Sequence, residues 1–266
     1  MFRQKYYIKR DESIIVDGHK LYRIVAVRNF GGIVKSGQKG GWIENESNLS
    51  HKGFCWVADE AKVYGDAEIT DNAIVSEEAR VCSKAKVLIQ GKLFDDARCN
   101  WTPVATKVCG DSTVSGHATV NGMTMCYNSH LRDNAVLTGY ARVWNSTVCD
   151  NAKVRDWANV SNAYIGEDAQ VGERARIDGG TNPDVGPFGI KYPTTKIHGA
   201  AVISGDAGVF GGAEVFGQAR VNGQASVHHN CVVTGEAWLH GKVELFNKRI
   251  DAGEYSKGKI FAFGCF

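Results

Sequence analysis

The sequence predicts an all-β chain wound into a parallel, three-sided β-helix of about ten coils, shaped as a triangular prism. Three observations point to this fold: a six-residue window recurs along most of the chain, 31 glycines can supply corners, and only four prolines are present. Repetition at a short fixed period is typical of solenoids, in which each coil stacks on its neighbours. The chain has 266 residues, 43% of them apolar, which is enough to bury a core.

The repeat predicts one short strand and one corner per window. Between Cys55 and Phe246, 30 windows can be counted; the first position is Ala in 20 of them, and the third is Val, Ile or Leu in 28. These two positions flank a mostly polar residue, so they form the buried face of a strand. The fifth position is mostly Gly, Asp or Asn, which tolerate a positive φ at least cost. A corner is therefore expected after each strand.

Irregular windows support the same interpretation. Three shortened windows end in Asn128, Asn145 and Asn162, spaced 17 residues apart, and we expect these residues to stack along one edge. The prolines fall in two insertions, Pro103 within 103–105 and the other three within 178–194. Proline inside a ladder would remove a strand hydrogen bond, so its exclusion from the windows favours strands.

The two ends of the chain differ from the repeats, and three segments are expected. Residues 1–54 predict an N-terminal β cap that contains a hairpin around Asp17-Gly18, residues 55–246 the β-helix, and residues 247–266 a C-terminal cap. Caps are expected because an open end of a solenoid exposes unpaired strand edges.

Composition argues against several functional classes. The formal net charge of +2 gives no broad basic field, so nucleic acid is not an expected partner. No apolar run is long enough to span a bilayer and the N-terminus does not look like a signal peptide, so we expect a cytoplasmic protein without membrane contact. The eight cysteines occur singly, without a CxxC pair, so no metal site is expected.

With a small residue two places before an aliphatic one, the windows resemble the hexapeptide-repeat family of left-handed parallel β-helices. The resemblance covers roughly 190 residues and implies that the coil is left-handed. The spacing of the windows alone does not indicate the handedness. The segment Gly40-Gly41-Trp42-Ile43-Glu44, with Leu49 and Cys55-Trp56-Val57 after it, is similar to YdcK-like proteins. These are described as transferases of enterobacteria, with related chains in phage and prophage genomes.

The first resemblance implies a candidate catalytic residue. Hexapeptide acyltransferases use a histidine general base and bind coenzyme A between the subunits of a trimer. His198 is the best-placed histidine, because it follows the insertion 178–194, and a long loop is often functional. This insertion also supplies candidate binding residues, namely Asp184, Phe188, Lys191 and Tyr192.

Fourth positions one coil apart should lie above one another. Phe210, His228 and Phe246 are then expected to form one column, and His198 and Phe216 lie together on a second edge. Exposed stacked aromatic side chains often mark contact with a partner, although they can also simply cover backbone. Among functional roles, a subunit interface is favoured.

Two hypotheses follow from the sequence. The first is a non-enzymatic binding or scaffolding protein of phage, prophage or other bacterial type, which presents its prism faces and the 178–194 loop to a protein partner or small ligand. The resemblance implies a homo-oligomer, a trimer in that family, but a capped prism is also viable as a monomer. The alternative is an acyltransferase that uses an acyl-coenzyme A donor and His198; in that case the cofactor is a coenzyme A derivative. The first is preferred because no complete catalytic set is evident, and a fold does not imply an activity.

Overall fold

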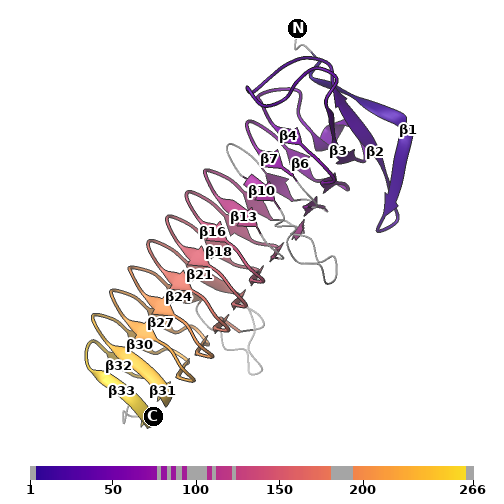
Figure 1. Cartoon of the computed structure of the whole chain (residues 1–266). Helices are drawn as coiled ribbons and strands as arrows, with labels where there is room; N and C mark the ends of the chain where they lie inside the picture. The colour runs from indigo at the N-terminus through magenta and orange to yellow at the C-terminus, as the bar shows by residue number, and fades with distance from the viewer. Residues whose placement is uncertain are drawn as a thin grey trace. The chain divides into compact units, whose positions relative to one another are not determined.

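The computed structural model describes residues 4–76, 79–82, 85–87, 92–94, 107–109, 112–121, 124–180 and 194–261. In these residues the fold is all-β, and the single 3-10 turn η1 (Glu46–Asn48) is the only helical element. The chain divides into two compact units, residues 1–134 and residues 135–266, which are described one at a time. Counted together, they contain about 10 turns of parallel β-solenoid (Figure 1), as the repeat predicts.

The first unit begins with an antiparallel hairpin. Strands β1 (Tyr6–Val16) and β2 (His19–Ala26) pair from Tyr6↔Ala26 to Val16↔His19. The connecting residues Asp17 and Gly18 have φ values of 50° and 84°, as a tight two-residue hairpin turn requires. The hairpin that Asp-Gly predicts is therefore confirmed.

The parallel ladders of the first unit begin at β3 (Lys39–Ile43), before the predicted start at Cys55. Strand β3 pairs antiparallel with β2 and parallel with β5, and Leu49 forms a bridge to Ile69. The first ladder continues from β3 through β5 (Lys62–Val63), β8 (Arg80–Val81), β11 (Lys107–Cys109) and β14 (Met125–Tyr127). The second contains β4 (Trp56–Val57), β7 (Ile74–Val75), β10 (Lys92–Phe94) and β13 (Thr119–Asn121). The third contains β6 (Glu68–Ile69), β9 (Lys86–Val87), β12 (Thr113–Val114) and β15 (His130–Leu131).

The second unit also consists of three parallel ladders. One contains β16 (Val136–Leu137), β19 (Lys153–Val154), β22 (Gln170–Val171), β25 (Val202–Ile203), β28 (Arg220–Val221) and β31 (Trp238–Phe246). Another contains β17 (Arg142–Trp144), β20 (Asn159–Ser161), β23 (Arg176–Asp178), β26 (Gly208–Phe210), β29 (Ser226–His228) and the far end of β31. The third contains β18 (Thr147–Val148), β21 (Ala163–Ile165), β24 (Thr195–Ile197), β27 (Glu214–Val215), β30 (Val232–Val233) and β32 (Arg249–Ile250). Strand β33 (Glu254–Phe261) pairs in parallel with β31, so the ladders extend past Phe246.

The core of each coil is built from the first and third window positions. In the coil around β28, for example, Ala219 and Val221 are completely buried, while Arg220 between them is exposed. A small residue next to each corner and a branched one at mid-strand together fill the inside of the coil. The alternation in the sequence therefore decides which side chains face inward.

Corner residues adopt the positive φ that the fifth position predicts. Gly217 has a φ of 73°, and Asn145 and Asn162 have 47° and 50°. The Asn145 Nδ2 donates to the Asn162 Oδ1 at 3.4 Å, so this part of the predicted asparagine stack is formed. At other corners a carboxylate links neighbouring coils. Glu173, which has a φ of 55°, accepts a hydrogen bond from the Gly205 N–H of the next coil at 2.7 Å.

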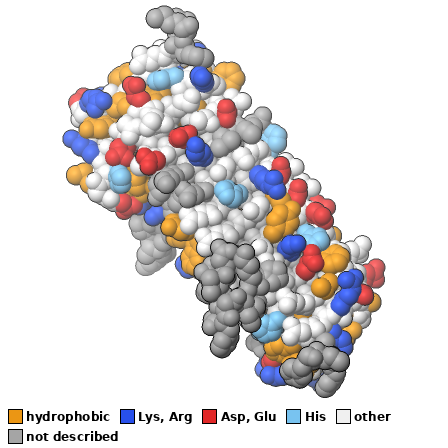
Figure 2. Space-filling view, turned by 180° about the vertical axis from the view of Figure 1, so that it is seen from behind, with side chains coloured by type: hydrophobic (Ala, Val, Ile, Leu, Met, Phe, Trp, Pro, Cys, Tyr) orange, Lys and Arg blue, Asp and Glu red, His pale blue; other side chains and the backbone are white. Residues whose placement is uncertain are grey.

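Charged side chains of both signs are interspersed on the face in view in Figure 2, with hydrophobic and histidine side chains among them. Among the described residues, the search for a bilayer-spanning helix finds no segment of sufficient length and apolar character.

Candidate functional site

The second unit places four rings in a stack that we call the aromatic column: Phe210, His228, Phe246 and Phe261. Ring centroids are 5.2 Å apart from Phe210 to His228, 4.6 Å from His228 to Phe246, and 5.0 Å from Phe246 to Phe261. These separations match the spacing of about 4.8 Å between neighbouring strands, because each ring ends a strand in one ladder. The expected column is therefore present, and Phe261 lengthens it.

Charged groups line the aromatic column. The guanidinium of Arg176 lies over the Phe210 ring, 5.9 Å from its centroid. Glu244 on β31 and Lys259 on β33, two and three strands beyond the strand of Phe210, form an ion pair of 3.0 Å. The Phe261 ring is 48% exposed, and the other three rings are half-buried. Apolar ring edges and charges of both signs thus share one face of the solenoid.

His228 is the only titratable member of the aromatic column. Its Nε2 lies 3.0 Å from the Ser226 Oγ. Burial between the neighbouring rings, and secondarily the adjacent His229, lower the pKa of His228 from its usual value. At neutral pH the column is therefore an uncharged stack.

His198 lies in the second unit at the end of β24, on a different ladder. Its Nε2 is 3.1 Å from the Glu214 Oε1, its Nδ1 is 4.0 Å from the Glu167 Oε2, and its ring stacks on Phe216 with centroids 4.9 Å apart. A general base needs a lone pair that faces the proton it removes. With a carboxylate near each nitrogen, the ring is held in place and neither nitrogen is left without a neighbouring acidic group.

The remaining predicted binding residues, Asp184, Phe188, Lys191 and Tyr192, lie outside the described residues.

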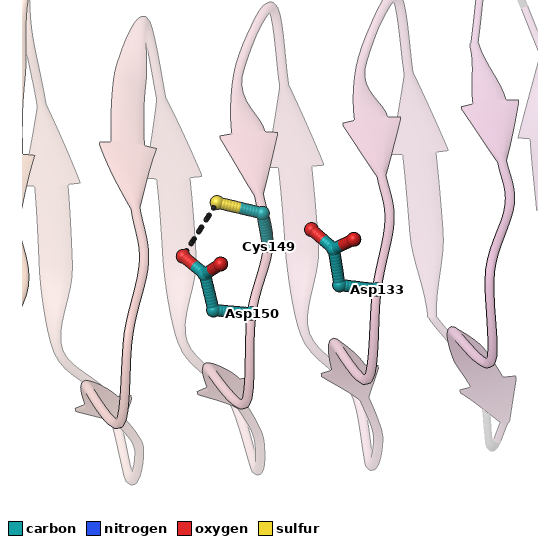
Figure 3. Close-up of side chains that lie close together, drawn as sticks. All are labelled: Asp133, Cys149 and Asp150. Atoms are coloured by element: carbon teal, nitrogen blue, oxygen red, sulfur yellow. Dashed lines mark hydrogen bonds between the residues drawn. The ribbon is translucent and has the colours of Figure 1, made fainter.

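A buried cysteine of the second unit, Cys149, has a polar neighbourhood. The Cys149 Sγ lies 3.1 Å from the Asp150 Oδ2 (Figure 3) and 3.1 Å from the Tyr164 hydroxyl. The same Asp150 oxygen accepts the Glu167 N–H at 2.9 Å. Asp150 thus connects the thiol to the next corner of the coil, which is a structural use of both side chains.

The first unit contains a pocket of about 660 Å³ where the hairpin turn meets the solenoid. Its wall is formed by polar side chains from the turn and from the ends of β3, β5 and β8, together with Lys107 of β11. The hairpin is held there by apolar packing, since Ile14 and Val16 contact the buried cluster that Leu21, Trp42 and Tyr64 share with Cys82. The lining residues are Asp17, His19, Glu44, Asn45, Tyr64, Gly65, Asp66, Cys82 and Lys107.

Two hydrogen-bonded pairs fix the geometry of this pocket. The Tyr64 hydroxyl donates to the Asp17 Oδ2 at 2.6 Å, and the His19 Nδ1 lies 3.0 Å from both carboxylate oxygens of Glu44. The Gly65 N–H donates to the Glu44 Oε2 at 2.7 Å, which orients the carboxylate. Within the described part of the chain, the His19 Nε2 makes no hydrogen bond, so this nitrogen remains available to a ligand.

The electrostatics of the pocket follow from these contacts. The hydrogen bond from Tyr64, against a small burial effect, lowers the pKa of Asp17, and the cations Lys107 and Arg80 act in the same direction. Burial, with the bond to Asp17, raises the pKa of Tyr64 far above its usual value. Burial opposes ionisation of Glu44, but His19 and the Gly65 N–H outweigh it and lower the pKa of that carboxyl.

Sequence reasoning missed this pocket. The Asp-Gly turn was a clear signal for the hairpin, but His19 and Glu44 are 25 residues apart and belong to no repeat. Their contact requires the hairpin to fold back onto the ends of β3 and β5, which no periodicity encodes.

No protein-family model matches this chain, and no curated protein matches it. The parallel β-solenoid is established by the strand pairing described above, whereas membership of the hexapeptide-repeat or YdcK-like families remains a prediction.

Proposed function

We propose that this chain is a non-enzymatic scaffolding protein that self-associates through the aromatic column, with Phe210, His228, Phe246 and Phe261 at the contact between copies. The single observation that carries the proposal is the continuous stack of half-exposed rings along one ladder of the second unit. A bacterial or phage origin and a cytoplasmic location complete the proposal and rest on the sequence alone.

A second copy is the partner that the chemistry favours. The column is flanked by Arg176, Glu244 and Lys259, so the same face carries apolar edges, cations and an anion. A surface with both signs can be complementary to itself, as a symmetric interface requires. Stacked rings buried at the centre of such an interface would supply most of the binding energy.

Analytical ultracentrifugation of the full chain over a wide concentration range tests this proposal. We expect the wild type to be oligomeric and Phe246→Ser to shift the dissociation constant by at least about tenfold, because it removes the ring that joins His228 to Phe261. Trp157→Ser is the matched control, since Trp157 is 62% exposed and stacks on Tyr140 away from the column.

A wild type that is monomeric at every concentration would overturn the proposal. So would dissociation by Trp157→Ser with none by Phe246→Ser, because the interface would then be the Trp157 face. Far-UV circular dichroism and melting temperature confirm that each variant is folded.

The pocket of the first unit favours a second candidate function, acyl transfer from an acyl-coenzyme A donor. Its support is the His19–Glu44 pair, in which a carboxylate orients an imidazole and the second ring nitrogen stays open to the pocket. Calorimetry with acetyl-coenzyme A tests this function on the wild type, His19→Ala and His198→Ala. Absence of binding to the wild type rejects acyl transfer, and the variant that loses turnover identifies which histidine is the base.

A further inference from the structure

The N-terminal end of the first unit contains a buried amine next to a buried thiol. Lys5 precedes β1, Cys55 precedes β4, and both residues are completely buried. The Lys5 Nζ lies 3.2 Å from the Cys55 Sγ and 2.8 Å from the Cys55 carbonyl oxygen. The two residues are 50 positions apart, so the contact fastens the start of the chain to the first coil.

The surroundings favour the neutral amine. Among the described residues Lys5 has no ion-pair partner, and Arg28 adds an unfavourable positive charge. The Phe30 ring, with its centroid 5.2 Å from the Lys5 Nζ, acts in the opposite direction, because an aromatic face attracts a cation. Burial is the largest effect and lowers the pKa of Lys5, while Cys55 opposes it. The other titratable groups around this pair are Tyr6, Glu46, His51 and Asp71.

The thiol is equally restrained. The Cys55 Sγ lies 3.3 Å from the Ser50 carbonyl oxygen and 3.5 Å from that of Ile69, so it can donate its proton to the backbone. Burial raises the pKa of Cys55. Cys55 is a free thiol, so its sulfur is available for oxidation.

From this juxtaposition we propose that Lys5 and Cys55 form a covalent nitrogen–oxygen–sulfur crosslink when the protein is exposed to hydrogen peroxide. The first peroxide takes two electrons from sulfur, which converts the thiol to a sulfenic acid and releases one water. The second peroxide takes two electrons as the sulfenic oxygen forms a bond to the Lys5 nitrogen. The oxygen and the amine each lose one proton in this step, and the peroxide is reduced to two waters. One thiol, one amine and two peroxides thus give the crosslink and three waters.

Peroxide can reach the pair through the exposed segment that directly precedes Cys55. Lys52, Gly53 and Phe54 are exposed, and local opening of such a surface segment costs little free energy. The crosslink then fixes the start of β1 to the first coil, so denaturation of the oxidised protein should require more denaturant. A thiol reductant should reverse the reaction.

Intact mass spectrometry of peroxide-treated full-length protein provides the test. We expect a gain of about 14 Da, from one oxygen gained and two hydrogens lost, rather than the roughly 16 Da or 32 Da of sulfenic or sulfinic acid. Trypsin should not cut after Lys5, so the crosslink should join residues 4–9 to residues 53–62. Dithiothreitol should restore the original mass and both separate peptides.

Three controls assign the crosslink to this pair. Lys5→Arg keeps a long basic side chain but removes the primary amine, and Cys55→Ala places the commonest first-position residue at position 55. Both variants should lose the gain of about 14 Da. Cys231 is an internal control. Its Sγ lies 2.8 Å from the His228 carbonyl oxygen, and in the described residues no lysine side-chain amine is bonded to it, so Cys231 should form no crosslink. Oxidation of Cys55 by oxygen addition alone, no change at Cys55, or a crosslink retained in Lys5→Arg would each overturn the proposal.

Discussion

Close stacking of corner glycines predicts that two similar substitutions in the second unit will have different costs. Gly217 and Gly211 both have positive φ, 73° and 64°. A Cβ added at Gly217 would lie 2.9 Å from the Gly235 nitrogen and 3.2 Å from its carbonyl oxygen, closer than the neighbouring coil can accept without moving. A Cβ at Gly211 would meet His229 backbone atoms at 3.4 Å, an ordinary contact.

The magnitudes separate the two effects. Placing a residue with a Cβ in the left-handed region destabilises the folded state by roughly 1–2 kcal/mol. Alanine also reduces the conformational entropy of the unfolded chain, which offsets about 0.4–1 kcal/mol of this cost. Gly211→Ala should therefore lower the free energy of unfolding by about 1 kcal/mol. Gly217→Ala carries the same terms plus an overpacking cost of about 1–3 kcal/mol, because backbone of the next corner must shift. The expected free-energy loss for Gly217→Ala is therefore about 2–4 kcal/mol.

Urea denaturation followed by far-UV circular dichroism and tryptophan fluorescence measures this difference. Coincident transitions with the two probes and equal m-values show that the comparison is valid. If both variants lose the same free energy of unfolding within about 0.5 kcal/mol, contact with the corner of the next coil does not limit substitution at Gly217.

Three further predictions concern hydrogen bonds and titration. Because folding lowers the pKa of Asp17, its carboxylate stabilises the protein at pH values above the usual pKa of Asp, and this stabilisation is lost as the pH falls through the lowered pKa. Tyr64→Phe removes the hydrogen bond that lowers the pKa, so the melting temperature of this variant should depend less on pH below about pH 4. His228 also has a lowered pKa, so on acidification the unfolded state binds a proton before the folded state does, and stability declines below about pH 6.5. His228→Phe keeps a ring in the stack and should remove this decline from the plot of melting temperature against pH. At Glu173, substitution by Gly relieves about 1 kcal/mol of backbone strain and loses a bond to Gly205 of similar worth, whereas substitution by Ala only loses the bond. Urea denaturation should therefore show Glu173→Gly near neutral and Glu173→Ala destabilised by about 1 kcal/mol, and the opposite order would contradict the strain argument.

Contacts one coil apart could be predicted from the sequence because a solenoid repeats them at a fixed separation. The Phe210, His228 and Phe246 stack and the Asn145–Asn162 bond both follow from counting 17 or 18 residues along the chain. The same counting placed Ala and Val side chains in the core. It also gave His198 and Phe216 as neighbours, but could not show that Glu214 and Glu167 would lie beside both imidazole nitrogens.

The ends of the repeat were harder to place. Strand β3 and Leu49 lie on the parallel ladders although their sequence lacks the Ala-x-Val pattern, and β33 continues the ladder as Glu-Tyr-Ser-Lys rather than as a window. A terminal coil packs against one neighbour only, so its residues are less restricted and the pattern fades.

The amino-acid sequence by itself determined the all-β class, the strand and corner of each window, the inward face and the hairpin turn, because each depends on residues a few positions apart. Only the tertiary structure decided which distant groups meet: His19 with Glu44, Tyr64 with Asp17, and Lys5 with Cys55. Those pairs depend on where an antiparallel hairpin docks on a parallel coil. Such docking is set by the packing of whole surfaces, which no local period records.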